Sequence, residues 1–335
     1  MHTPPFRPTE DAVAPAQPPR RIVPVLGMHR SGTSAVTRGL QALGVHLGDR
    51  MMPATPGIND RGFWEDLDIH ELNCEILQEL ETDWHRLTIW NPDFLPRLQE
   101  RGFVERAVDL LTEKLARNSI IGMKNPRMTM LLPFWQTVFA GCAAETRYVV
   151  VIRNPISIVQ SLVRRDGFDE EKIALLWLLH MVSAAEVLFQ GYAAIVVDYD
   201  RMLQDPSREL QRMAATLDLP LDAAAASIYE HDFLTTDLRH SHHTVEMLQR
   251  HAFIGPMTEA LYSALLAAAS SSPIDVPRLR HATLHARKEL ARWEPALPLL
   301  DKLFEVAQQC RQSRSARDDP DPQTDTDRSN PGRWK

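Results

Sequence analysis

The sequence predicts an α/β fold in which helices cover both faces of a central, mainly parallel sheet. Short apolar runs of strand length alternate along the chain with segments of helical period. These runs are almost continuously apolar, as expected of strands that are buried on both faces. Toward the C-terminus the helical spacing continues without further strands. The expected architecture is therefore a three-layer α/β/α sandwich with a C-terminal helical extension.

Four segments are the best strand candidates, namely 22–26, 119–123, 147–152 and 194–197. Each is short and rich in aliphatic residues, many of them β-branched, which favours a strand. Pro24 is an exception, because proline cannot donate a hydrogen bond to a neighbouring strand. We therefore expect an irregularity in the first strand.

Helices are expected after each of the strands. Apolar residues recur at helical spacing in 36–43, after the first strand, and in 128–139, after the second. Residues 154–155 and 205–206 read Asn-Pro and Asp-Pro after the third and fourth strands. Because each pair places a capping residue before a first-turn proline, helices should begin there.

We expect four regions along the chain: a Pro-rich disordered tail at 1–20, a main domain at 21–255, a helical extension at 256–310 and a polar disordered tail at 311–335. The extension carries helical spacing at Leu261 and Leu265, then at Leu299, Leu303 and Val306.

The composition excludes several classes of protein. With 335 residues, 44% of them hydrophobic and 24% charged, the chain can bury a large core. A net charge of −7 indicates no overall basic field for nucleic acid or an anionic membrane. The three cysteines lie far apart without metal-ligand spacing, which favours reduced thiols. No signal peptide or long apolar span is evident, so we expect a cytoplasmic protein.

Residues 27–34, Gly-Met-His-Arg-Ser-Gly-Thr-Ser, lie between the first strand and the first helix. The backbone amides of such a loop can hold phosphate oxygens. In nucleoside triphosphatases a lysine follows the second glycine and reaches the outer phosphates, but here Thr33 takes that position and Arg30 offers a cation inside the loop. This pattern favours a sulfuryl donor, which needs less countercharge. The alternative is a turn without a ligand.

Two further cations end predicted strands. Arg153 stands at the end of the third strand beside a capped helix start, where it can offer two hydrogen bonds to a phosphate, and Ser161 lies eight residues further on. Lys124 follows the second strand, at the edge where α/β sheets bind ligands, and could stabilise a developing charge. Ordinary capping and a surface lysine are the alternatives.

These segments together resemble the PAPS-dependent sulfotransferase family (PAPS is 3′-phosphoadenylyl sulfate), most closely a bacterial branch with the same first loop. The resemblance runs from about residue 21 to 243 and implies a P-loop-like fold. It implies that the 5′-phosphosulfate end of PAPS lies against Arg30, Ser31, Gly32, Thr33 and Ser34. It implies that Arg153 and Ser161 bind the 3′-phosphate. Residues 122–127 look like the family's Lys-Asp-Pro-Arg segment, with Asn125 in place of the commoner aspartate.

The proton of the acceptor must pass to a base, and the acidic turn at 59–66 is the candidate. A glutamate in a comparable place is thought to be the base in several branches of the family. Glu65 is our first choice, followed by Asp66 and then by His70 or His29. In the alternative interpretation Glu65 and Asp66 only cap the following helix, and the neighbouring Phe63 and Trp64 either line an acceptor pocket or belong to the core.

The segment 238–243 contains Arg239 and three histidines. We interpret it as a mobile loop that closes over the donor, with Arg239 binding the nucleotide, rather than as a metal site. Arg165, at the end of the Ser161 helix, is a further candidate for the nucleotide or a solvated turn.

The resulting hypothesis is a cytoplasmic, metal-independent sulfotransferase with Glu65, Arg30 and Lys124 as catalytic residues and PAPS as co-substrate. The acceptor would be a hydroxyl or amine on a carbohydrate or glycan. We expect neither a nucleic-acid partner nor an integral membrane segment, and the oligomeric state is left open. The alternatives are a P-loop kinase with an atypical lysine and a non-catalytic protein that binds PAPS or its product, adenosine 3′,5′-bisphosphate (PAP).

Overall fold

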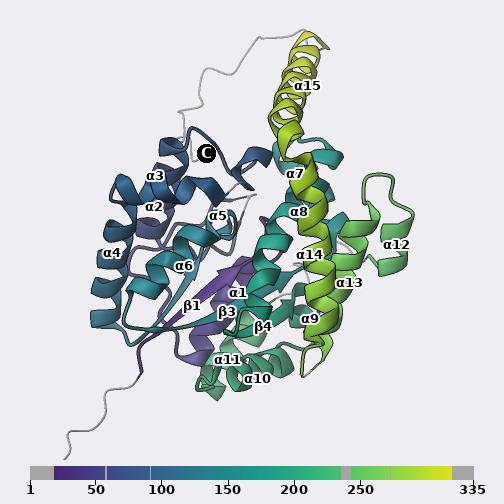
Figure 1. Ribbon diagram of the computed structural model, residues 1–335. Coiled ribbons are helices and arrows are strands. Elements are labelled where there is room, and N and C mark those ends of the chain that lie inside the picture. Colours follow the sequence, from purple (N-terminus) through teal and green to yellow (C-terminus); the bar gives the residue numbers. More distant parts are fainter. Residues whose placement is uncertain (1–18, 57–58, 91, 235–242, 272, 319–335) are drawn as a thin grey trace, which may run out of the picture.

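The computed structural model describes residues 19–318 except 57–58, 91, 235–242 and 272. Four parallel strands form one sheet in the order β2-β1-β3-β4. Figure 1 shows this sheet at the centre of the molecule. They are β1 (Arg21–Leu26), β2 (Ile120–Lys124), β3 (Glu145–Ile152) and β4 (Ala193–Asp198). All four predicted strands and their parallel arrangement are confirmed.

Pro24 lies in the inner strand β1, where it pairs with Met123 of β2. On the other side, the pairs between β1 and β3 involve Arg21 and Ile22, then Val25 and Leu26, and pass over Val23 and Pro24. The missing N–H of proline explains this local gap. The expected irregularity is therefore real, and it leaves the strand in place.

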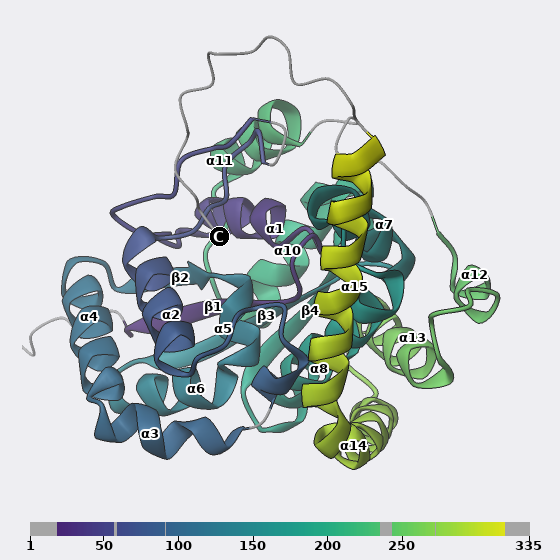
Figure 2. The same ribbon diagram turned by 90° about the horizontal axis from the view of Figure 1, so that it is seen from above.

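Fifteen α-helices surround the sheet within the described residues. On one side lie α2 (Leu67–Glu79), α3 (Leu95–Glu100), α4 (Phe103–Arg117), α5 (Pro126–Met130), α6 (Leu132–Gly141), α7 (Pro155–Asp166), α8 (Glu170–Glu186), α13 (Pro256–Ser270) and α14 (Val276–Trp293). On the other lie α1 (Thr33–Gly39), α9 (Tyr199–Gln204), α10 (Pro206–Leu217) and α11 (Ala223–Ile228). The chain also forms α12 (Val245–Gln249) and α15 (Leu297–Asp318). Figure 2 shows the sheet between α1 and α10 on one side and α6 and α8 on the other.

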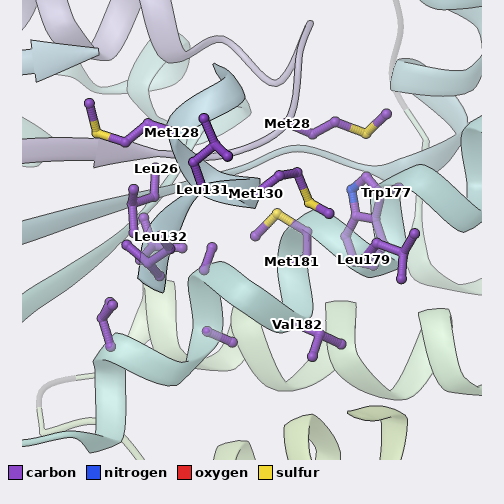
Figure 3. Packing of buried hydrophobic residues seen from close by; sticks show 14 of the residues in the cluster. Leu26, Met28, Met128, Met130, Leu131, Leu132, Trp177, Leu179, Met181 and Val182 are labelled. Carbon is purple, nitrogen blue, oxygen red and sulfur yellow. The ribbon is translucent and has the colours of Figure 1, made fainter. Parts of the chain in front are cut away.

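Alternate strand residues enter two separate hydrophobic clusters. Ile22 and Leu26 of β1 face the larger cluster, whereas Val23 and Val25 face the smaller one. Figure 3 shows part of the larger cluster, in which Met28 lies near Met130, Met181 and Trp177. Because burying one such side chain stabilises the fold by about 1.5–3 kcal/mol, these two clusters hold the strand ends firmly in position.

Helix α8 and the 3-10 turn that follows it together form the stretch Glu170–Phe189, which is long and apolar enough to cross a membrane by length and composition. Its mean hydropathy is 1.6 and 78% of it is buried. Packing against α7, α13 and α14 explains that burial. Its composition is that of a helix in the interior of the fold.

The C-terminal helices are held in two ways. Buried leucines of α13 and α14, such as Leu261 and Leu290, join the larger cluster. Helix α15 extends to Asp318, past the boundary expected at 310. Its predicted apolar positions Leu299, Leu303 and Val306 are 59%, 55% and 57% exposed, so their spacing indicates the helix but not its packing. The four-region division stays a prediction, and 319–335 lie outside the described residues.

Candidate active site

The candidate site residues meet at one edge of the sheet, beyond the carboxyl ends of the parallel strands. The loop 27–34 follows β1, Lys124 ends β2, Arg153 follows β3 and Tyr199 follows β4. Open α/β sheets bind ligands at this edge, beside the point where the strand order reverses. That point lies here between β1 and β3.

The loop 27–34 is fixed by short contacts of its own. The Ser31 hydroxyl donates to the Met28 carbonyl at 2.7 Å. Thr129 Oγ1 accepts from the Gly27 amide at 3.0 Å and donates to the Gly27 carbonyl at 3.1 Å. Arg30 has a left-handed backbone with φ of 67°, a conformation that non-glycine residues rarely adopt outside constrained sites. These contacts hold the loop in one shape.

Gly32 is required by both its backbone and its surroundings. Its φ is 89°, and a Cβ atom built on it would lie only 2.0 Å from a ring carbon of Tyr199. The tyrosine ring therefore lies directly against the loop backbone. Tyr199 was not among the sequence candidates, although its position directly after a strand is the one shared by the loop, Lys124 and Arg153.

The two predicted phosphate sites are in contact with each other. Arg30 Nε donates to Ser161 Oγ at 2.9 Å, and an Arg153 Nη1 donates to the Arg30 carbonyl at 3.3 Å. The Arg153 guanidinium carbon lies 4.8 Å from the ring centre of Tyr199. Within the described part of the chain, Arg153 Nε is buried without a hydrogen-bond partner. This donor can therefore bind an acceptor group that enters the site.

Burial and the neighbouring Arg165 and Arg153 lower the pKa of Arg30 from its ordinary value. The three guanidinium groups thus repel one another across a partly desolvated space. An anion placed there would relieve this repulsion.

Glu65 and Lys124 form a buried ion pair at the same edge. Lys124 Nζ lies 2.6 Å from Glu65 Oε1 and 3.2 Å from Ser34 Oγ, at the start of α1. Burial raises the pKa of Glu65, but the charges of Lys124 and His70 and their hydrogen bonds lower it further, so the net shift is downward. Burial also lowers the pKa of Lys124, against the opposing effect of Glu65. The carboxylate is therefore ionised at neutral pH.

The other candidate bases have different partners in the structure. Asp66 caps α2 by accepting from the Asp68 amide at 2.9 Å, and it pairs with Lys114 at 2.7 Å. His70 Nδ1 lies 3.6 Å from Glu65 Oε2. His29 lies with its ring centre 4.1 Å from that of Trp84, and burial together with the charge of Arg165 lowers its pKa.

Trp64 turns away from the carboxylate that follows it. Its φ of 54° is left-handed, and such a conformation costs about 1–3 kcal/mol for a non-glycine residue. The indole packs against Phe233 at 5.9 Å and lies under the guanidinium of Arg38. Of the two interpretations open from the sequence, the core interpretation fits Trp64.

Two candidates from the sequence remain, Arg165 and Arg239. Arg165 forms a two-pronged ion pair with Asp166, and its guanidinium lies 5.6 Å from the ring centre of Trp84. Arg239 lies outside the described residues. Just after that segment, the His243 carbonyl accepts from Asn154 Nδ2 at 3.0 Å, so the chain returns to the fold beside the start of α7.

Comparisons with known proteins identify the family of the chain. The model of a family described as the sulfotransferase family matches residues 23–223, more than half of the chain. None of the curated proteins matches significantly. One similar solved structure is the sulfotransferase domain from the Synechococcus PCC 7002 olefin synthase, at 17% identity and a TM-score of 0.39, covering 82% of this chain and 95% of that one. Another is the sulfotransferase domain from the curacin biosynthetic pathway, at 15% identity and a TM-score of 0.39, covering 81% and 98%.

Proposed function

Because the chain belongs to the sulfotransferase family, we propose that it transfers a sulfuryl group from PAPS to a hydroxyl or amine of a carbohydrate, with Glu65 as the general base. The observation that carries this proposal is the contact between Arg30 and Ser161. This contact places two sites with phosphate-binding chemistry next to each other. PAPS needs two such sites, because it carries a phosphate at each end of its ribose.

The residues at the sheet edge fit such a donor. Arg153, through its unpartnered Nε, and Ser161 would hold the 3′-phosphate. The 5′-phosphosulfate end would be held by the first loop, at Arg30, Ser31, Gly32, Thr33 and Ser34. When bound, PAPS supplies the sulfuryl group and leaves as PAP.

The residues of the chain then have distinct tasks. Glu65 Oε1 accepts the proton of the acceptor, because its carboxylate is ionised and faces the phosphate loop through Lys124. Lys124 and Arg30 stabilise the negative charge that gathers on the oxygen between sulfur and phosphorus. A sulfuryl group carries less charge than a phosphoryl group, so we propose that these two cations suffice and that no metal ion is required.

The acceptor class and the location are further parts of this proposal. The carbohydrate acceptor rests on the resemblance of the first loop to the bacterial branch. The three cysteines Cys74, Cys142 and Cys310 are free in the structure, which supports a reducing compartment such as the cytoplasm.

Two measurements test the proposal. Thermal melting with PAP, with ATP and Mg²⁺, and with buffer should show stabilisation by PAP; preferential stabilisation by ATP and Mg²⁺ would instead support a kinase. Transfer of radiolabelled sulfate from PAPS to a panel of sugars should then be lost in Arg153→Ala and Glu65→Gln. Normal turnover in both variants would overturn these assignments, and binding of PAP without turnover on any acceptor would indicate a binding protein.

A further inference from the structure

Asn125 lies between the catalytic edge of the sheet and the start of α5. It is fully buried and directly follows Lys124, the last residue of β2. Its side-chain oxygen caps α5 by accepting from the Arg127 amide at 3.0 Å. Because the cap determines where the oxygen points, the amide nitrogen has to face the other way.

That nitrogen faces Glu65. Asn125 Nδ2 donates to Glu65 Oε2 at 2.7 Å, while Oε1 of the same carboxylate lies 2.6 Å from Lys124 Nζ. The two oxygens are thus held by different partners. Oε2 points to the buried side and Oε1 points to the phosphate loop, where Lys124 also contacts Ser34.

The charged groups around this carboxylate come from three elements. Lys124 from β2 and His70 from α2 face it directly, and Arg127 from α5 stands behind them, near enough to lower the pKa of both. Burial lowers the pKa of His70, but its contacts with Cys74 and Glu65 raise it to about 9. Asn125 Nδ2 lies 3.2 Å from His70 Nδ1. Since two nitrogens cannot both donate across that gap, a protonated His70 competes with the amide for Oε2.

We propose that Asn125 is a positioning residue for sulfuryl transfer: its amide occupies Glu65 Oε2 and so leaves Oε1 as the atom that receives the acceptor's proton. This inference rests on the proposed function of Glu65 as base. In the step, the acceptor oxygen forms a bond to sulfur, its proton passes to Oε1, and the sulfur–oxygen bond to the donor phosphate breaks with its electron pair going to PAP. The Asn125 amide stabilises the ionised carboxylate by donating a hydrogen bond, and it adds no second cation beside Lys124.

Asn125→Asp tests this role, because aspartate has nearly the same shape as asparagine. Aspartate caps helices as well as asparagine does, but it places a second carboxylate within 3 Å of Glu65 in place of a donor. Like charges at this distance raise the pKa of the pair. The acid limb of kcat/KM against pH should therefore move upward by about one pH unit, giving a roughly tenfold loss at pH values below the limb, where the base is mostly protonated in both proteins, and little loss at pH 8. Binding of PAP should be unchanged.

Asn125→Ser is the second variant, because serine also caps the helix but is too short to reach Glu65. It should lower kcat and move the acid limb in the same direction by less, with normal PAP binding. If either folded variant keeps the wild-type pH profile and kcat, the positioning role is wrong.

Glu65→Gln separates this inference from the proposed function. An inactive Glu65→Gln together with an unshifted Asn125→Asp overturns only the role of Asn125. An active Glu65→Gln overturns the base itself.

Discussion

Lys124 and Glu65 place the cation and the carboxylate of the proposed site in one buried contact of 2.6 Å. Each is almost inaccessible to solvent, at 3% and 5% exposure. Removing one partner of a buried ion pair leaves the other charge buried and uncompensated. The resulting loss of stability is larger than the net stability that the intact pair contributes. The pair thus ties stability and activity to the same two residues.

We predict that Lys124→Met destabilises the protein by about 3 kcal/mol, toward the lower end for a broken buried pair because Asn125 still donates to Glu65. The pKa of Glu65 should rise, since Lys124 is the main charge that lowers it. Activity should fall by about 100-fold or more. Urea unfolding and PAPS turnover measure both effects. Lys302→Met, at an exposed position of α15, is the control, and equal loss in both would contradict the prediction.

Gly32→Ala should destabilise the protein by more than about 2 kcal/mol, because alanine is strained in a left-handed backbone and its Cβ would also meet the Tyr199 ring at 2.0 Å. Gly167→Ala is a matched control: its φ is 67°, yet nothing lies within 4 Å of its added Cβ. It should show the backbone strain alone, about 1–2 kcal/mol. Urea unfolding and PAP binding give the comparison, and PAP binding should fall only in the first variant.

At the scale of elements, helix α9 is capped by a carboxylate whose ionised form is disfavoured by burial. Asp198 caps it by accepting from the Asp200 amide at 3.1 Å. Burial, with a smaller effect from the charge of Asp200, raises the pKa of Asp198 from 3.8 to about 6. An acid whose pKa is raised on folding contributes full stability below pH 3.8, and this contribution is lost as the pH rises through about 6.

Asp198→Asn should therefore stabilise the protein at pH 8 while keeping the cap. The gain should be about 1–3 kcal/mol, given roughly 1.4 kcal/mol per pKa unit, and should vanish at pH 4. Unfolding in urea at the two pH values is the measurement. Asp205→Asn, at the exposed cap of α10, should change stability little at either pH. A gain that is the same at pH 4 and pH 8 would refute the charge explanation.

One buried carboxylate ties helix α15 to the segment that contains Leu87 and Thr88. Asp301 is 2% exposed and accepts from the Leu87 amide, the Thr88 amide and the Thr88 hydroxyl at 2.9, 3.2 and 3.0 Å. This attachment holds the segment that follows Trp84 and His85. Leu297 of α15 is buried in the larger cluster, whereas the predicted apolar positions of this helix are exposed, so α15 is held by apolar packing together with such polar contacts.

Asp301→Ala should weaken the attachment by about 3 kcal/mol, because buried donors are left without partners. Hydrogen exchange of the Leu87 and Thr88 amides should speed up by on the order of 100-fold, since about 1.4 kcal/mol corresponds to a factor of ten. Arg311→Ala breaks only a more exposed ion pair with Asp169 and should cost about 1 kcal/mol or less. Unchanged exchange at both amides would show that α15 is held by other contacts.

Over the whole molecule, local patterns proved sufficient for the strands and for most helix starts. The buried runs and the Asn-Pro and Asp-Pro pairs carry their meaning within a few residues, so β3 and the starts of α7 and α10 follow directly from them. The helix expected over 128–139 is in fact divided into α5 and α6 at Leu131. Pro133 in the first turn of α6 is the local signal for that division.

Local patterns in the sequence predict some residues of the site but not the contacts between them. Arg30, Lys124 and Arg153 could be named because cations at strand ends have few other roles. The contacts of Glu65 with Asn125, and of Gly32 with Tyr199, join residues far apart in the chain, and no spacing encodes them. Whether Trp64 lines a pocket or packs on Phe233 likewise depends on one left-handed backbone angle.

The contact between Arg30 and Ser161 also bears on how fast the protein can work. Both phosphates proposed to sit on either side of it are still present after the sulfuryl group has gone, so the spent nucleotide keeps nearly every attraction that held the fresh one. Release of PAP, rather than formation of the new bond to sulfur, would then limit the rate of turnover. PAP that accumulates would then inhibit the enzyme by competing with PAPS for the same site.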